Sequence, residues 1–105
     1  MRFSFHPKAL REYKDAALWY EEQRNQLGVE FTEAVKEAIE VALKNPTRFQ
    51  PVDDQVRILR LKRFPYHLFF RYREAAQHIQ FIAVMHNRRR PDYWRRRADG
   101  TSPSH

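Results

Sequence analysis

Apolar residues in the first half of the chain recur at helical spacing and form two stripes. Pro7 suits the first position of a helix, where its missing N–H costs nothing, and the stripe that follows runs to Tyr20. Residues 25–28 interrupt the pattern, and a second stripe begins at Phe31 and is stopped by Asn45-Pro46. The two amphipathic segments therefore predict a helical hairpin, which must bury its apolar side against another surface.

Four shorter runs have the residue pattern of β-strands. The first, RFSFH at residues 2–6, precedes the helices, and three more follow them: VRILRLKRF (56–64), HLFFRYR (67–73) and HIQFIAVMH (78–86). Short connections separate the last three, and such connections require antiparallel neighbours. We therefore predict an α+β domain of order β-α-α-β-β-β, in which the helical hairpin packs on one face of a small antiparallel β-sheet and a short C-terminal segment follows.

A tight turn at residues 74–77 would fix which side chains share a face of this sheet, because directly paired residues lie on the same face. The pairs expected beneath the helices are Leu68–Ala83, Phe70–Phe81 and Tyr72–Ile79. The alternate positions then form an opposite, open face. Its expected members are Arg60, Lys62, His67, Phe69, Arg71, Gln80, Ile82, Val84 and His86. The Ile58-Leu59 doublet breaks the alternation and predicts a bulge in its strand.

The composition supports one domain with an uneven distribution of charge. At 105 residues, 42% of them apolar, the chain is long enough for a single modest core, which we place in residues 1–97, with 98–105 as a flexible tail. Residues 1–55 carry a net charge of −2, whereas residues 56–105 hold twelve Lys/Arg against three Asp/Glu, a net charge of +9. The C-terminal half is therefore expected to face a polyanion, either a nucleic acid or an acidic protein.

The residues that the sequence lacks disfavour several classes of protein. Without Cys, disulfides and thiolate catalysis are excluded. We find neither a secretory signal nor an apolar run near the ~18 residues of a membrane span, and expect a cytoplasmic protein with no membrane contact. Between Val56 and Pro91 the only carboxylate is Glu74, so two histidines cannot complete a catalytic zinc site. There is no glycine-rich phosphate loop, and we expect no metal and no cofactor.

The expected open face combines fixed cations with two imidazoles, a set that binds phosphate well. Metal-free RNA cleavage needs a base for the 2′-hydroxyl, an acid for the leaving oxygen and cations for the developing charge. The alternative is that the histidines are structural or solvated and that the arginines only keep an open sheet face soluble. The candidates for chemistry are His67 and His86 for proton exchange, Arg60, Arg71 and Arg88 for charge, and Tyr93 or Trp94 for stacking on a base.

The stretch MHNRRRPDYWRRR, residues 85–97, concentrates positive charge after the last strand. Pro91 ends the strand, and the Tyr-Trp pair is expected to begin a short segment that folds back on the sheet. Trp19 falls opposite the apolar stripe of the first helix, so it either contacts a partner or caps the helical hairpin. The residues expected to contact a nucleic acid or an acidic partner are Lys62, Arg71, Arg89, Arg90, Trp94, Arg95, Arg96, Arg97 and Trp19.

Four motifs occur together and in a characteristic order: ALWYEEQRNQLGVEF, NPTRF, VRILRLKRFPYHLFFRY and IAVMHNRRRPDYWRRR. In this combination, over nearly the whole chain, the sequence resembles the RelE/ParE superfamily of type II toxin–antitoxin toxins. The resemblance implies a toxin held in a hetero-oligomer with its cognate acidic antitoxin. It also implies one of two targets, because RelE-like toxins cut ribosome-bound mRNA whereas ParE-like toxins inhibit DNA gyrase.

The resemblance assigns roles unevenly. The cationic strand position before the turn matches Arg60, and the C-terminal tyrosine of the nuclease members matches Tyr93. Where those members tend to carry an arginine after the turn, this chain has His67, and their tail arginine falls near Asn87 or Arg88. If the chain is a ribonuclease, the catalytic candidates are Arg60, His67, His86, Arg88 and Tyr93.

Three hypotheses follow from these residues. The Arg-Phe-Pro-Tyr turn at 63–66 and the AVMHNRR run at 83–89 resemble the ParE-like side, which favours inhibition of DNA gyrase without catalysis. A RelE-like, ribosome-dependent mRNA interferase is the alternative. The third hypothesis is a basic binding module, or a toxin relic, that binds its partner without toxicity.

Overall fold

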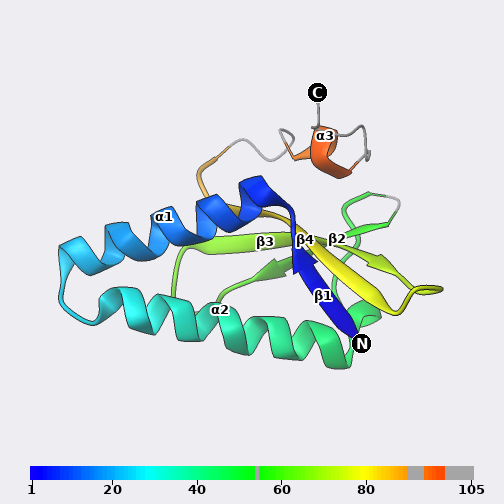
Figure 1. The fold of residues 1–105 in the computed structure, drawn as a ribbon, viewed down its shortest axis with the longest axis horizontal. Coiled ribbons are helices and arrows are strands. Elements are labelled where there is room, and N and C mark those ends of the chain that lie inside the picture. Colours follow the sequence, from blue (N-terminus) through cyan, green and yellow to red (C-terminus); the bar gives the residue numbers. More distant parts are fainter. Residues whose placement is uncertain (54, 90–93, 99–105) are drawn as a thin grey trace.

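The computed structural model describes residues 1–53, 55–89 and 94–98, with the side chains of residues 96 and 98 excepted. The predicted order β-α-α-β-β-β and the α+β class are confirmed, and Figure 1 shows the two long helices joined by a short turn and packed beside the sheet. No helix in these ranges is both long and apolar enough to cross a membrane. The elements are β1 (Arg2–Phe5), α1 (Pro7–Gln23), α2 (Leu27–Lys44), the 3₁₀ turn η1 (Pro46–Arg48), β2 (Val56–Arg60), β3 (Tyr66–Arg73), β4 (His78–His86) and α3 (Arg95–Ala98).

The sheet has the strand order β1-β4-β3-β2. Strands β2, β3 and β4 are antiparallel neighbours, as their short connections predicted. Strand β1, however, pairs with β4 in parallel, so the expectation of an entirely antiparallel sheet is wrong and the sheet is mixed. The reason is the length of the intervening chain, because a connection that contains helices can carry the chain back across the sheet and allow parallel pairing.

A one-residue irregularity separates the observed register of β3 and β4 from the expected one. The pairs Phe70–Phe81 and Tyr72–Ile79 are as predicted, but the register shifts between Phe69 and Phe70, and Leu68 pairs with Val84 instead of Ala83. The extra residue in β4 is Ile82. The predicted bulge at Ile58-Leu59 is wrong, because β2 and β3 pair without interruption there. A shift of one residue turns every later side chain of β4 to the other face.

Both faces of the sheet carry buried apolar side chains, so the expectation of a wholly open second face is wrong. The helix-side core joins α1 and α2 to residues such as Leu59, Leu68 and Phe81. On the reverse face, which is the face turned away from α1 and α2, a second cluster forms beneath Trp94. Its buried members are Val56, Ile58, Phe69, Ile82, Ala83, Met85 and Trp94. The Ile58-Leu59 doublet is apolar because Leu59 packs in the helix-side core and Ile58 packs in the cluster on the reverse face.

The junction of the helical hairpin depends on Glu21 and on the absence of a side chain at residue 28. The carboxylate of Glu21 accepts hydrogen bonds from the backbone N–H groups of Gln26 (2.9 Å) and Gly28 (3.0 Å), which lie at the start of α2 and have no helical partner. A Cβ at Gly28 would lie 2.5 Å from the Ala17 carbonyl oxygen. Gly28 therefore lies in the first turn of α2 and not in the connecting turn, and it permits close approach to α1.

An ion pair attaches the C-terminal helix to the rest of the fold. The guanidinium of Arg97 donates two hydrogen bonds of 3.0 Å to the two carboxylate oxygens of Glu12 in α1 and a third, of 2.9 Å, to the carbonyl of Ile82. Glu12 also accepts the backbone N–H of Val84 at 2.9 Å. Strand β1 pairs with β4 only as far as Phe81. Beyond that point, the side chain of Arg97 bonds the carbonyl of Ile82 and the side chain of Glu12 bonds the N–H of Val84, so these backbone groups beside the irregularity have partners.

Candidate functional site

A hollow of about 330 Å³ opens on the reverse face where β2 ends and β3 begins. Arg60 and His67 are directly paired there, so their side chains point to the same side of the sheet. The segment after β4 and the start of α3 complete the walls. The lining residues are Val52, Ile58, Arg60, His67, Phe69, Asn87, Arg89, Trp94 and Arg95.

His67 forms the floor of this hollow and is 5% exposed. Its Nδ1 lies 2.7 Å from the Asn87 side-chain oxygen. Because an amide oxygen only accepts, Nδ1 carries the proton of the neutral ring and leaves Nε2 as an acceptor. Burial lowers the pKa of His67 below its ordinary value, the Asn87 bond opposes that shift, and the positive charge of Arg60 adds to it. The ring is therefore neutral at physiological pH and able to accept a proton.

Fixed cations surround this imidazole. Arg60 is exposed and, among the residues that the structure describes, enters no ion pair. Arg89 lines the same hollow. Arg95 is paired with Asp53 and lies 4.9 Å from the ring centre of Trp94. Arg60 is thus an exposed cation on which an anion in the hollow would depend, whereas the charge of Arg95 is already partly neutralised.

Two of the residues expected to contact a partner are structural. Trp94 is 2% exposed and stacks on Phe69 with ring centres 4.8 Å apart, and Phe69 in turn meets His67 edge-on at 5.1 Å. Arg97 is nearly buried, and its guanidinium is paired with the carboxylate of Glu12. The C-terminal segment folds back, so that Trp94 closes the reverse-side cluster and Arg97 is engaged with Glu12 and the Ile82 carbonyl, and neither side chain is presented as an open contact.

The two imidazoles predicted to share a face do not do so. His86 pairs with Tyr66, whereas His67 pairs with Met85, so the two rings project from opposite faces of the sheet. His86 contacts the ring of Tyr66 at 5.2 Å and accepts the backbone N–H of Arg88 at its Nδ1. Arg88 itself is exposed and does not line the hollow. His86 lies on the unexpected face because Ile82 is an extra residue in β4, and it reverses the direction of the β4 side chains that follow it.

The remaining predicted residues are dispersed. Lys62 lines a different groove, between α2 and the end of β2. Arg71 lies on the reverse face but toward the far end of β3, where it pairs with Gln80. Trp19 is 54% exposed on α1 and meets Tyr20 edge-on at 5.1 Å, so it remains a candidate contact. The predictions for Arg90 and Tyr93 fall outside the described residues, as do the side chain of Arg96 and residues 99–105 of the predicted tail; Ala98, the first residue of that tail, is helical and ends α3.

Asn87 is the residue that sequence reasoning missed as a partner of the site. The signals were its position directly after the last strand, where a residue can turn back over the reverse face, and its alignment near the tail arginine of the nuclease members. In chemical terms the hollow offers one neutral proton acceptor and three arginines, of which Arg95 is paired with Asp53, and this set suits a single phosphate or carboxylate group. In the described ranges no group of His, Cys, Asp and Glu is arranged to hold a metal ion.

Comparison with known proteins gives one family and one fold. The family model for the ParE toxin of the type II toxin–antitoxin system parDE matches residues 3–91. A chain of the chromosomal ParDE system from P. aeruginosa superposes with a TM-score of 0.70 at 17% identity, over 82% of this chain and 95% of that one. The isolated RelE toxin of E. coli gives 0.62 at 16% identity, over 92% and 94%. No curated protein matches the sequence significantly.

Proposed function

The chain belongs to the ParE toxin family of type II toxin–antitoxin systems, and from that premise we propose that it inhibits growth by binding DNA gyrase and is neutralised by an acidic antitoxin. The observation that carries the proposal is the family match, which extends from β1 to the end of β4 and includes the whole helical hairpin. The chain's formal charge of +7 suits an acidic partner. Candidate contacts with that partner are Lys62, Arg88, Arg89, Arg95 and Trp19.

The geometry of the hollow supports inhibition by binding more than catalysis. Cleavage of RNA without a metal needs one group to take a proton and another to deliver one on the far side of the reacting phosphate. His67 can serve as the first, but His86 projects from the other face. Binding to a protein target requires no proton transfer and is compatible with an imidazole locked by Asn87.

A RelE-like mRNA interferase is the second candidate, and one observation favours it. His67 is neutral, presents Nε2 to the hollow, and lies beside Arg60 and Arg89. That set would accept a proton from a 2′-hydroxyl and hold the charge of a phosphate. In that case Tyr93 would be the candidate proton donor or stacking residue, in keeping with the resemblance to nuclease members.

The decisive experiment compares the two targets with the same purified chain. We expect induced expression to arrest growth, and the purified chain to abolish supercoiling by DNA gyrase while leaving ribosome-bound transcripts intact. Arg60→Gln should weaken the inhibition, because it removes an exposed cation from the hollow without disturbing an ion pair. Lys36→Gln, an exposed change on α2 with the same loss of charge, serves as the matched control and should act like the unaltered chain.

Each other result has a defined meaning. Transcript cleavage on ribosomes that disappears in His67→Gln, with gyrase unaffected, replaces the first proposal by the interferase. An intact, folded chain that changes neither gyrase nor transcripts and leaves growth untouched supports the third hypothesis, a binding module or toxin relic. Equal activity of the Arg60→Gln and Lys36→Gln variants would mean that the hollow is not the working surface.

A further inference from the structure

The reverse face carries a second, separate set of polar residues at the end of the sheet opposite the hollow. Strand pairing aligns Arg2 of β1, His78 of β4 and Arg73 of β3 in one row across the sheet. The next row consists of Ser4, Gln80 and Arg71 in the same three strands. Paired residues share a face, and neighbouring strands lie about 4.8 Å apart. The six side chains, here called the polar lattice, therefore emerge side by side with the two outer arginines of the first row roughly 10 Å apart at their roots.

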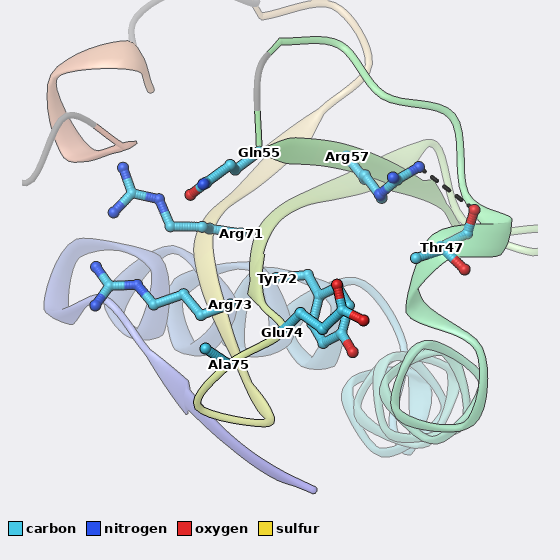
Figure 2. A pocket seen from close by; sticks show the side chains of 8 residues that line it. All are labelled: Thr47, Gln55, Arg57, Arg71, Tyr72, Arg73, Glu74 and Ala75. Carbon is cyan, nitrogen blue, oxygen red and sulfur yellow. Dashed lines mark hydrogen bonds between the residues drawn. The ribbon is translucent and has the colours of Figure 1, made fainter.

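The opposite face of these strands is apolar, which fixes the orientation of the polar lattice. The intervening residues of β1, Phe3 and Phe5, contact Phe81, a member of the helix-side core. Figure 2 shows Arg71 and Arg73 directed to one side of β3, while Tyr72 and the carboxylate of Glu74 lie on the other. The arginines thus project from the face of β3 that is turned away from α1 and α2.

The arginines of the first row are available to a ligand. Arg2 and Arg73 are exposed and take part in no ion pair within the described part of the chain. They line a shared hollow of about 340 Å³ together with Ser4 and His78, whose side chains are hydrogen-bonded to each other at 3.0 Å. Two fixed charges with a hydroxyl and an imidazole between them form a continuous set of hydrogen-bonding groups.

We propose that the polar lattice is a binding surface for the phosphodiester backbone of a nucleic acid, a function beyond the toxin activity proposed above. Contacts to phosphate oxygens come from Arg together with Ser, Gln and similar polar side chains, and the two rows together supply three Arg, one Ser and one Gln beside His78. A protein partner would instead need an apolar or aromatic centre. None of the six side chains of the polar lattice is apolar or aromatic; Phe3 lines the same hollow, but its ring contacts those of Phe5 and Phe81.

Fluorescence anisotropy with labelled oligonucleotides of one length tests the proposal on the purified full-length chain. Arg2→Gln/Arg73→Gln should weaken binding on the order of tenfold, because two charge-assisted contacts are lost. The slope of log affinity against log salt should become shallower by about 1.8 with duplex DNA as the probe or about 1.4 with single-stranded RNA, and the probe that binds more tightly is the preferred source of the backbone. Arg2→Lys/Arg73→Lys should retain most of the slope, since the charges remain.

The matched control is Arg11→Gln/Lys36→Gln, which removes two exposed cations from α1 and α2 and should change little. Circular dichroism establishes that each variant is folded. An equal loss in the control pair would mean that only net charge matters, and the proposal falls. It also falls if Arg60→Gln abolishes binding while Arg2→Gln/Arg73→Gln has no effect, or if an oligoglutamate peptide binds the polar lattice and oligonucleotides do not. Because no gyrase or ribosome is present, failure here leaves the proposed toxin function unaffected.

Discussion

Replacing Arg97 by Met should destabilise the fold and release the C-terminal helix, because it breaks a nearly buried ion pair. The side chains of Arg97 and Glu12 are 9% and 17% exposed, and the fork joins them by two hydrogen bonds of 3.0 Å. Removing one member of a buried pair leaves an uncompensated charge and costs about 3–5 kcal/mol. We expect about 3 kcal/mol, because Glu12 keeps its hydrogen bond from the Val84 N–H. The melting temperature should then fall by roughly 12 °C or more.

Urea denaturation measures the global effect, and the fluorescence of Trp94 measures the local one. The chain has two tryptophans, so a Trp19→Phe background leaves Trp94 as the sole reporter. Its emission should shift to the red if α3 detaches and exposes the ring. Arg63→Met is the matched control, because its pair with Glu30 is exposed (64% and 32%) and should contribute less than about 1 kcal/mol.

A double variant tests whether Glu12 and Arg97 are energetically coupled. Glu12→Gln removes the charge but keeps an acceptor for Val84, so Glu12→Gln/Arg97→Met should cost clearly less than the sum of the two single changes. The reasoning is refuted if Arg97→Met costs less than about 1 kcal/mol, or if the double variant is additive within about 0.5 kcal/mol. Either result would mean that α3 is not held to the sheet by this pair.

Two further predictions concern the buried histidines and the helical hairpin. Burial lowers the pKa values of His6 and His67 below 6.5, so the unfolded chain binds more protons. The free energy of unfolding by urea should therefore fall as the pH drops from about 7.5 to about 5.5, and fall less in His67→Gln; a constant or rising value contradicts this. Gly28→Ala should destabilise by about 1–3 kcal/mol, because its Cβ would meet the Ala17 carbonyl oxygen at 2.5 Å. The usual preference of helices for Ala predicts the opposite sign, so a stabilised variant rules out the steric contact.

The site itself was only partly predictable, and the failures come from the register of β4 and from contacts between distant segments. Arg60 and His67 lie on one face as expected, but the expected tight turn at Phe64-Pro65 sets Lys62 beside His67. Residues 61–65 in fact connect the two strands, and Arg60 is the observed partner of His67. His86 was placed on the wrong face because one extra residue, Ile82, enters β4 between the turn and that histidine. An irregularity of this kind leaves no clear mark in a run as uniformly apolar as FIAVM. The fork of Glu12 and Arg97 was equally invisible, because its members are 85 residues apart.

What the sequence by itself determined is the set of elements and their order, because the period of apolar residues and the short turns are local properties of the chain. It also determined that β2, β3 and β4 are antiparallel neighbours. The tertiary structure decided how those elements meet: the parallel pairing of β1, the register of β4, and the return of Trp94 to the reverse face. Each of these depends on contacts between distant segments, and in a sheet with a period of two a single-residue shift exchanges the buried and the open side chains.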